Sequence, residues 1–196
     1  GLVGSEMCIR DSWKMMHVCN SPDVSDIFIR MYDDIYFLRK MDFSHMSELK
    51  ALYDASNCMN RTDGTSEDTW LRQLYKTYTA LKESNLCSTI WNFETHLPEV
   101  FVKSVLLWII NNYNALDNRL LITTLYNNHC WQEGEQPPIL VNKYVNIKAG
   151  FYGLNSDYSY HARYEEEIKH IIKGKYFLNH NDNGLTPGLM NVIKGM

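Results

Sequence analysis

Apolar residues along the chain recur at two different spacings, which predict a mostly helical protein with a short extended region. After Pro98, the positions that recur every three or four residues are Val102, Val105, Leu106, Ile109, Ile110 and Tyr113. This spacing is typical of a helix with one buried face. The sequence therefore predicts a core helix that begins near Glu99. We expect its Val105, Leu106 and Ile109 side chains to be buried.

The residues before this helix predict a short antiparallel strand region around residues 86–97. Glu94 and His96 are two residues apart, so their side chains would point to the same face of a strand. Pro98 has no N–H to donate, so a strand must end or lie at an edge there. We therefore expect Glu94 and His96 to lie together at a strand end, supported by the helix that follows.

Several other segments show helical spacing or helix-boundary signals. They are residues 22–38, 44–55, 66–84, 117–129 and 164–172, followed by a last helix that starts at Thr186-Pro187. Ser21-Pro22 is typical of a helix start, and Gly174 is typical of a helix end. Residues 141–152 fit a helix and a strand equally well. The predicted fold class is α+β, dominated by helices.

Composition narrows the class of protein. The chain has 196 residues, of which 45% are apolar and 21% charged, as in ordinary globular domains. The net charge of −4 argues against a dedicated nucleic-acid binder, although it leaves room for a local basic patch. The longest apolar run, residues 100–110, is too short to span a bilayer. Five dispersed cysteines favour reduced thiols. These features predict a cytoplasmic protein that binds neither nucleic acid nor membrane.

The first twelve residues differ in character from the rest. They read Gly-Leu-Val-Gly-Ser-Glu-Met-Cys-Ile-Arg-Asp-Ser and resemble a translated sequencing adaptor. We therefore expect residues 1–12 to be a non-native tail that packs on nothing. Residues 13–196 are predicted to form a single domain, an internal or C-terminal fragment of a larger protein.

Candidate chemistry is sparse. The seven histidines and five cysteines form no HExxH or CxxC arrangement, and the glycines form no phosphate-binding loop. Adjacent His129 and Cys130 are a weak metal candidate. Glu94 can coordinate Mg²⁺, which prefers oxygen ligands, and His96 can hydrogen-bond an anionic group. On chemistry alone, surface residues at a strand end explain the same pattern more simply.

The segment around Glu94 and His96 also resembles a motif of a known protein family. Residues 91–100 read Trp-Asn-Phe-Glu-Thr-His-Leu-Pro-Glu-Val. They resemble the motif Trp-Arg-Val-Glu-Phe-Arg-Pro-Met-Glu-Val of the eukaryotic-type glutamate–cysteine ligase catalytic subunit, without a gap. Weaker similarities occur in the family's order at residues 28–30, 105–107, 116–117, 171–175 and 187–189. Together these matches cover residues 28–189.

The resemblance implies a fragment of a glutamine-synthetase-like ligase fold. It implies an ATP- and Mg²⁺-dependent enzyme that joins glutamate to cysteine, the first step of glutathione synthesis. Glu94 then corresponds to a metal ligand, and His96 stands where the family has a glutamate-binding Arg. Histidine lacks the guanidinium fork that binds carboxylates, and the family's N-terminal metal-binding glutamates are absent. The implied enzyme would therefore be inactive as this chain alone.

A different class of function fits the same sequence. The chain is rich in Tyr and also contains Trp and Met, and such side chains are frequent in protein interfaces. The alternative is a non-enzymatic helical module that binds a protein partner. An exposed apolar patch, with no polar cleft around Glu94, would favour this alternative.

Overall fold

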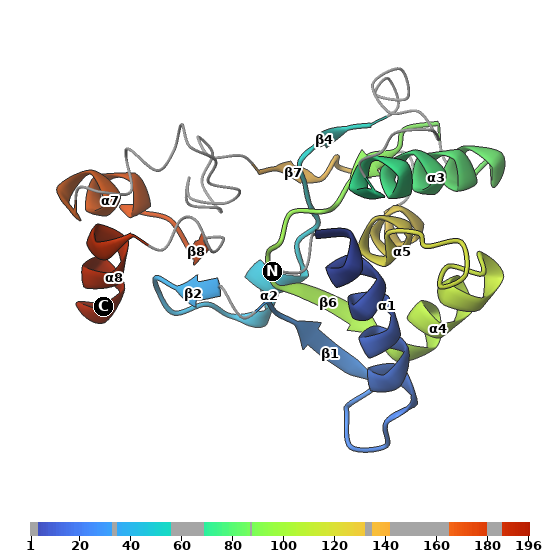
Figure 1. Ribbon diagram of the computed structural model, residues 1–196, viewed down its shortest axis with the longest axis horizontal. Helices are drawn as coiled ribbons and strands as arrows, with labels where there is room; N and C mark the ends of the chain where they lie inside the picture. Colours follow the sequence, from blue (N-terminus) through green and yellow to red (C-terminus); the bar gives the residue numbers. More distant parts are fainter. Residues whose placement is uncertain are drawn as a thin grey trace. The chain divides into compact units, whose positions relative to one another are not determined.

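The computed structural model confirms the α+β class (Figure 1). It describes residues 4–32, 35–55, 69–86, 88–131, 135–141, 165–179 and 186–196, with backbone alone for residues 4–11, Thr69 and Asn179. These residues form seven helices and four two-stranded sheets, which pair β1 with β6, β2 with β8, β3 with β7 and β4 with β5. No helix in these ranges is long and apolar enough to cross a membrane.

The chain divides into two compact units. Unit 1 comprises residues 1–30, 49–95 and 100–139, and unit 2 comprises residues 31–48, 96–99 and 140–196. The single domain expected over residues 13–196 stays a prediction. So does the non-native tail, because the side chains of residues 1–11 lie outside the described part. The backbone from Gly4 onward is helical, as the start of α1.

Unit 1 is built from four helices and short strands. The helices are α1 (Gly4–Asn20), α3 (Thr69–Glu83), α4 (Lys103–Asn112) and α5 (Ile122–Cys130). The strands are β1 (Ile27–Arg30), β3 (Lys50–Ala51), β4 (Tyr53–Asp54), β5 (Trp91–Asn92) and β6 (Glu99–Val102), with β7 (Ile139–Leu140) beside β3. In the antiparallel pair β4–β5, Tyr53 lies opposite Asn92.

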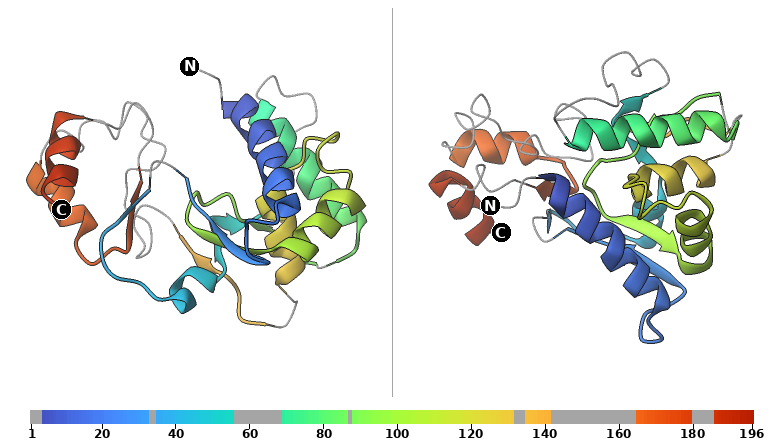
Figure 2. Two further views of the ribbon diagram at one scale, coloured as in Figure 1. Left: turned by 90° about the horizontal axis from the view of Figure 1, so that it is seen from below. Right: turned by 45° about the vertical axis from the view of Figure 1, so that its right-hand side comes forward.

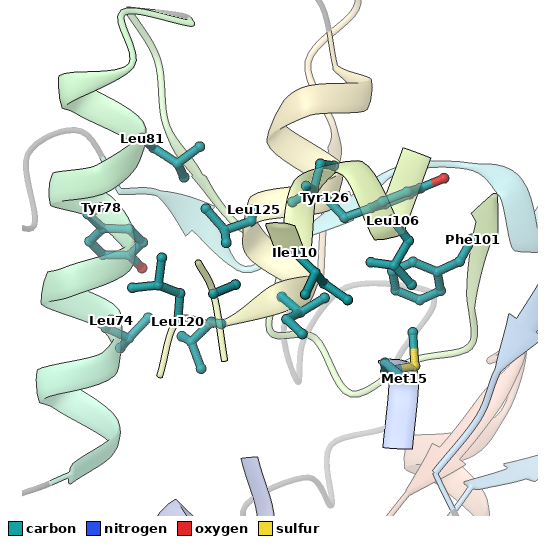
Figure 3. Close-up of a cluster of buried hydrophobic side chains, with 14 of the residues drawn as sticks. Met15, Leu74, Tyr78, Leu81, Phe101, Leu106, Ile110, Leu120, Leu125 and Tyr126 are labelled. Atoms are coloured by element: carbon teal, nitrogen blue, oxygen red, sulfur yellow. The ribbon is translucent and has the colours of Figure 1, made fainter. Parts of the chain in front are cut away.

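The core of unit 1 is formed by the apolar stripes of its helices (Figure 3). In α3, Leu74, Tyr78 and Leu81 recur at helical spacing and are almost fully buried, which confirms the helix predicted over residues 66–84. Leu106 from α4 and Leu125 from α5 meet them in the same cluster. The helix predicted over residues 117–129 is also present, as α5, although it begins later.

The start of the core helix was predicted wrongly. Residues from Glu99 onward form strand β6, and α4 begins only at Lys103, because β-branched and aromatic residues in this run favour the strand paired with β1. Burial of Leu106 and Ile109 is confirmed, whereas Val105 is 38% exposed. The buried face of α4 is too narrow to include Val105.

The strand predicted over residues 86–97 is much shorter. Only β5, residues 91–92, pairs with another strand. Beyond it, the Asn92 side-chain oxygen accepts a hydrogen bond from the Glu94 N–H at 2.9 Å. Asparagine side chains that bind the backbone in this way compete with strand pairing. Glu94 and His96 therefore lie outside the strand, and the alternation of faces along a strand does not apply to them.

Two N-terminal helices were also predicted wrongly. Residues 22–38 contain strand β1 and strand β2 (Ile35–Phe37) instead of a helix. The isoleucines and aromatic residues of this segment fit the period of a helix and also that of a strand, and pairing with other strands favoured the strand. The second predicted helix is reduced to α2 (Phe43–Ser47), which is capped by Asp42.

Besides α2, unit 2 contains a strand pair and two further short helices. In the antiparallel pair of β2 and β8 (Phe177–Asn179), Tyr36 lies opposite Leu178. Helices α7 (Glu165–Ile172) and α8 (Pro187–Lys194) pack against each other (Figure 2). Both confirm predicted helices.

Gly174 has a φ of +79° after α7, and the Thr186 hydroxyl caps α8. Ile168 is buried as expected, whereas Ile171 and Ile172 are only partly buried. The ambiguous segment from residue 142 lies outside the described residues.

Candidate functional site

The start of helix α5 is the centre of a buried polar network that includes Glu94. The residue before the helix, Leu121, has no side chain that can cap it. Glu94 supplies the missing acceptor from thirty residues away. Its Oε1 accepts hydrogen bonds from the Thr124 N–H at 3.2 Å and from the Thr124 hydroxyl at 2.8 Å. Glu94 therefore caps α5 from outside the helix.

This position suits a carboxylate energetically. The first N–H groups of a helix have no partner within the helix, and the helix dipole favours negative charge there. Glu94 is only 7% exposed, and burying a charge requires compensating hydrogen bonds. The bonds from Thr124 provide part of that compensation, so the arrangement stabilises both the helix and the carboxylate.

The segment that carries Glu94 is fastened to the same helix. The Asn128 side chain accepts from the Trp91 N–H at 2.9 Å and donates to the Trp91 carbonyl at 2.8 Å. The Phe93 N–H donates to the Thr124 hydroxyl at 3.3 Å. These side-chain hydrogen bonds fasten the backbone of residues 91–93 to α5, in addition to the pairing of β5 with β4. Together with the bonds of Glu94, they hold residues 91–94 against the start of the helix.

A guanidinium reaches the same end of α5. Arg30 Nη2 donates to the Thr123 hydroxyl at 2.7 Å, and the guanidinium lies 5.4 Å from the centre of the Phe101 ring. Arg30 and Glu94 therefore contact neighbouring threonines. The sequence pattern alone predicts no functional role for the side chains of Thr123, Thr124 and Arg30. The sequence did contain one signal for this network: two consecutive threonines at the start of a helix whose preceding residue, Leu121, cannot cap it.

His96 has different neighbours from Glu94. Its φ is +54°, a left-handed conformation that few non-glycine residues adopt. Its ring stacks on Tyr32, with centroids 4.6 Å apart and planes 11° apart. His96 belongs to unit 2 and Glu94 to unit 1. The expectation of one shared strand face is wrong, because neither residue is in a strand.

The other candidate residues are engaged with protein groups. His129 Nε2 lies 2.8 Å from the Tyr113 hydroxyl, and burial lowers the pKa of His129. Burial also raises the pKa of the Cys130 thiol, which disfavours the thiolate that a metal needs. Across the described ranges, no group of three or more His, Cys, Asp or Glu side chains is arranged to hold a metal ion.

The chain was also compared with known proteins. No family model, curated protein or solved structure matches it.

Proposed function

We propose that this chain is a non-enzymatic protein-interaction module whose β1–β6 strand pair binds the partner. The observation that carries the proposal is that the side chains of this pair are arranged in the opposite way to the usual one, with aliphatic residues toward solvent and a charged residue toward the protein. In β1, Ile27 and Ile29 are 53% and 38% exposed, whereas the Arg30 side chain is turned toward Thr123 and Phe101. The aliphatic residues of this strand therefore face solvent while its charged residue faces the protein.

Strand β6 repeats the reversed pattern. Glu99 and Phe101 are buried, and Val100 and Val102 are partly exposed. The Phe101 ring stacks on Phe28 of β1, with centroids 5.8 Å apart. Strands with one face in water ordinarily place polar residues on that face. Here the outer face consists of β-branched aliphatic residues, as is typical of a surface that another protein covers.

The charges beside this face indicate the chemistry of the partner. Asp23 and Asp26 are exposed just before β1. The nearby Lys103 ammonium is buried and donates to the carbonyls of Ser21 and Val24. The exposed charge at this end is therefore negative. A second copy would bring like charges together, which is unfavourable. The partner that fits is an amphipathic segment with basic residues beside its apolar face.

Two labelled synthetic peptides test this proposal. One is an amphipathic helix of Leu and Lys, and the other has the same Leu face with Glu in place of Lys. We expect fluorescence anisotropy to show binding of the Leu/Lys peptide only. The double variant Ile27→Thr/Ile29→Thr should weaken binding at least tenfold, because Thr keeps the β-branched shape and removes apolar surface.

The control is Val105→Thr, which removes a similar exposed aliphatic group from α4. It should leave peptide binding unchanged. Equal loss in the control and the double variant would reject the β1–β6 face. Concentration-dependent dimers that the double variant abolishes would show that a second copy, not a basic partner, covers this face.

A second candidate is the ligase fragment implied by the resemblance. One observation favours it: β1 pairs with β6, so the similar segments at residues 28–30 and 91–100 become neighbours. Arg30 and Glu94 then reach adjacent threonines. In this candidate Glu94 is the Mg²⁺ ligand, His96 contacts the glutamate substrate, and ATP supplies the phosphoryl group.

The Glu94 carboxylate is poorly arranged to coordinate Mg²⁺. Oε1 already accepts two hydrogen bonds from Thr124, and the positive end of α5 disfavours a cation. A coupled assay of the purified chain with ATP, Mg²⁺, glutamate and cysteine would favour the ligase candidate if it showed activity, whereas an absence of turnover agrees with the interaction module and with an inactive fragment alike. We expect no turnover. Glutamate-dependent phosphate release that Glu94→Gln abolishes would favour the ligase instead.

A further inference from the structure

Unit 2 carries four basic residues on two segments that the strand pair brings together. The antiparallel pair β2–β8 places Phe37 opposite Phe177, and the Leu38 N–H donates to the Tyr176 carbonyl at 3.0 Å. The basic residues lie next to the two strands. Arg39 and Lys40 come shortly after β2, and Lys173 and Lys175 come shortly before β8.

Arg39 links the two segments. Its guanidinium carbon lies 4.7 Å from the centre of the Tyr176 ring. A Cβ added at Gly174 would lie 3.8 Å from Arg39 Nη2, so the guanidinium extends beside the residue between Lys173 and Lys175. Stacking on an aromatic face leaves the edge N–H groups of arginine available as donors. These donors are arranged as the planar fork that binds phosphate in a bidentate manner.

The four cations are not neutralised within the described part of the chain. In the described ranges, none of the four side chains forms an ion pair or a hydrogen bond with a carboxylate. Asp42 is close in sequence, but its Oδ1 is engaged by Ser44 and His45. Lys173 and Lys175 follow the end of α7, where the helix dipole favours positive charge. That effect does not account for Arg39 and Lys40 in the adjoining segment.

We propose that Arg39, Lys40, Lys173 and Lys175 form a binding site for a phosphate group. Charges of the same sign repel one another, and at physiological ionic strength this repulsion is screened beyond about 8 Å. A bound dianion would convert this repulsion into attraction. The site stands on unit 2 alone and does not depend on the function proposed for the β1–β6 face.

Thermal unfolding in sodium phosphate tests the site, with sodium chloride at the same ionic strength as reference. A ligand that binds the folded state raises Tm along a saturating curve. We expect this rise for the natural chain. Lys175→Gln should raise Tm in chloride, because it relieves repulsion, and should weaken the apparent phosphate affinity at least tenfold. Arg39→Gln should weaken the affinity similarly.

The matched control is Lys169→Gln on α7. Lys169 is also exposed, but its ammonium pairs with Glu166 at 2.9 Å, so it should not contribute to the site, and the phosphate-dependent rise should persist. The proposal is overturned if phosphate and chloride give the same Tm, or if all variants show the same unsaturating rise. A phosphoserine peptide in a parallel arm distinguishes the source. A stronger effect than that of free phosphate indicates a peptide-borne group, and an equal effect indicates a free phosphate.

Discussion

At the scale of single residues, Glu94 shows how burial assigns a role that residue type alone leaves open. The sequence presented a carboxylate with two possible uses, a metal ligand and a surface group. Its burial and its two hydrogen bonds from Thr124 point to a third use, as a cap for α5. A long-range cap of this kind has no spacing rule, because the two residues are thirty positions apart.

Removing this cap should destabilise unit 1. We expect Glu94→Ala and Thr124→Val each to lower the free energy of unfolding by about 1–3 kcal/mol, because each leaves a buried partner unsatisfied. In urea unfolding, the double variant should cost less than the sum of the two, since both remove the same interaction. Strict additivity would show that the two side chains are not energetically coupled.

His129 should make stability depend on pH. Burial lowers its pKa in the folded state, so the unfolded state binds a proton more readily. The resulting stability is present above the unfolded pKa, about 6.5, and is lost as pH falls below it through the folded value. We expect urea unfolding to show a smaller loss of stability between pH 8 and pH 5 in His129→Gln. An unchanged pH profile would contradict this role.

At the scale of elements, apolar spacing predicted α3, α5 and α7 but misplaced the start of α4. Residues 99–102 fit the helical stripe and also the strand, and pairing with β1 decided for the strand. The error in residues 22–38 has the same cause, whereas the strand predicted over residues 86–97 stops at Asn92 because its side chain binds the Glu94 N–H. Short apolar runs fit both periods, and the partner that chooses between them lies elsewhere in the chain.

The buried stripe of α4 can be tested by a matched pair of truncations. Leu106 is fully buried, whereas Val105 is 38% exposed. Leu106→Ala should cost about 2–5 kcal/mol because it leaves a cavity. Val105→Ala should cost much less, as surface substitutions usually do. Chemical denaturation measures both, and equal costs would place the helix in a different orientation.

The end of α7 offers a second matched pair. Gly174 has a φ of +79°, whereas Gly195, which follows α8, has a φ of −88°. A Cβ at Gly174 would meet only Arg39 Nη2, at an ordinary 3.8 Å, so the cost of Gly174→Ala is backbone strain of about 1–2 kcal/mol. Gly195→Ala should be nearly neutral. Circular dichroism melts that show no difference would contradict the left-handed end of α7.

At the scale of the whole molecule, the chain has separate hydrophobic clusters in its two units. Leu106 belongs to the cluster of unit 1, and Leu189 packs with Ile168, Leu178 and Val192 in unit 2. Core amides exchange through openings of the unit that contains them. The two units are therefore expected to respond separately to cavities.

Hydrogen exchange measures this separation. Leu106→Ala should speed exchange at the amides of α3 and α5 and leave α7 and α8 unchanged. Leu189→Ala should do the reverse. If either variant speeds exchange equally in both units, the chain unfolds as one cooperative body, as the expectation of a single domain over residues 13–196 would require.

The sequence by itself determined the α+β class, the long amphipathic helix α3, the capped start of α8 and the left-handed residue after α7. Each depends on local spacing or on the backbone preference of one residue. Only the tertiary structure decided the strand at residues 99–102, the role of Glu94, the outward isoleucines of β1 and the basic cluster around Gly174. These depend on contacts between segments far apart in the chain, and local spacing carries no information about which segments meet.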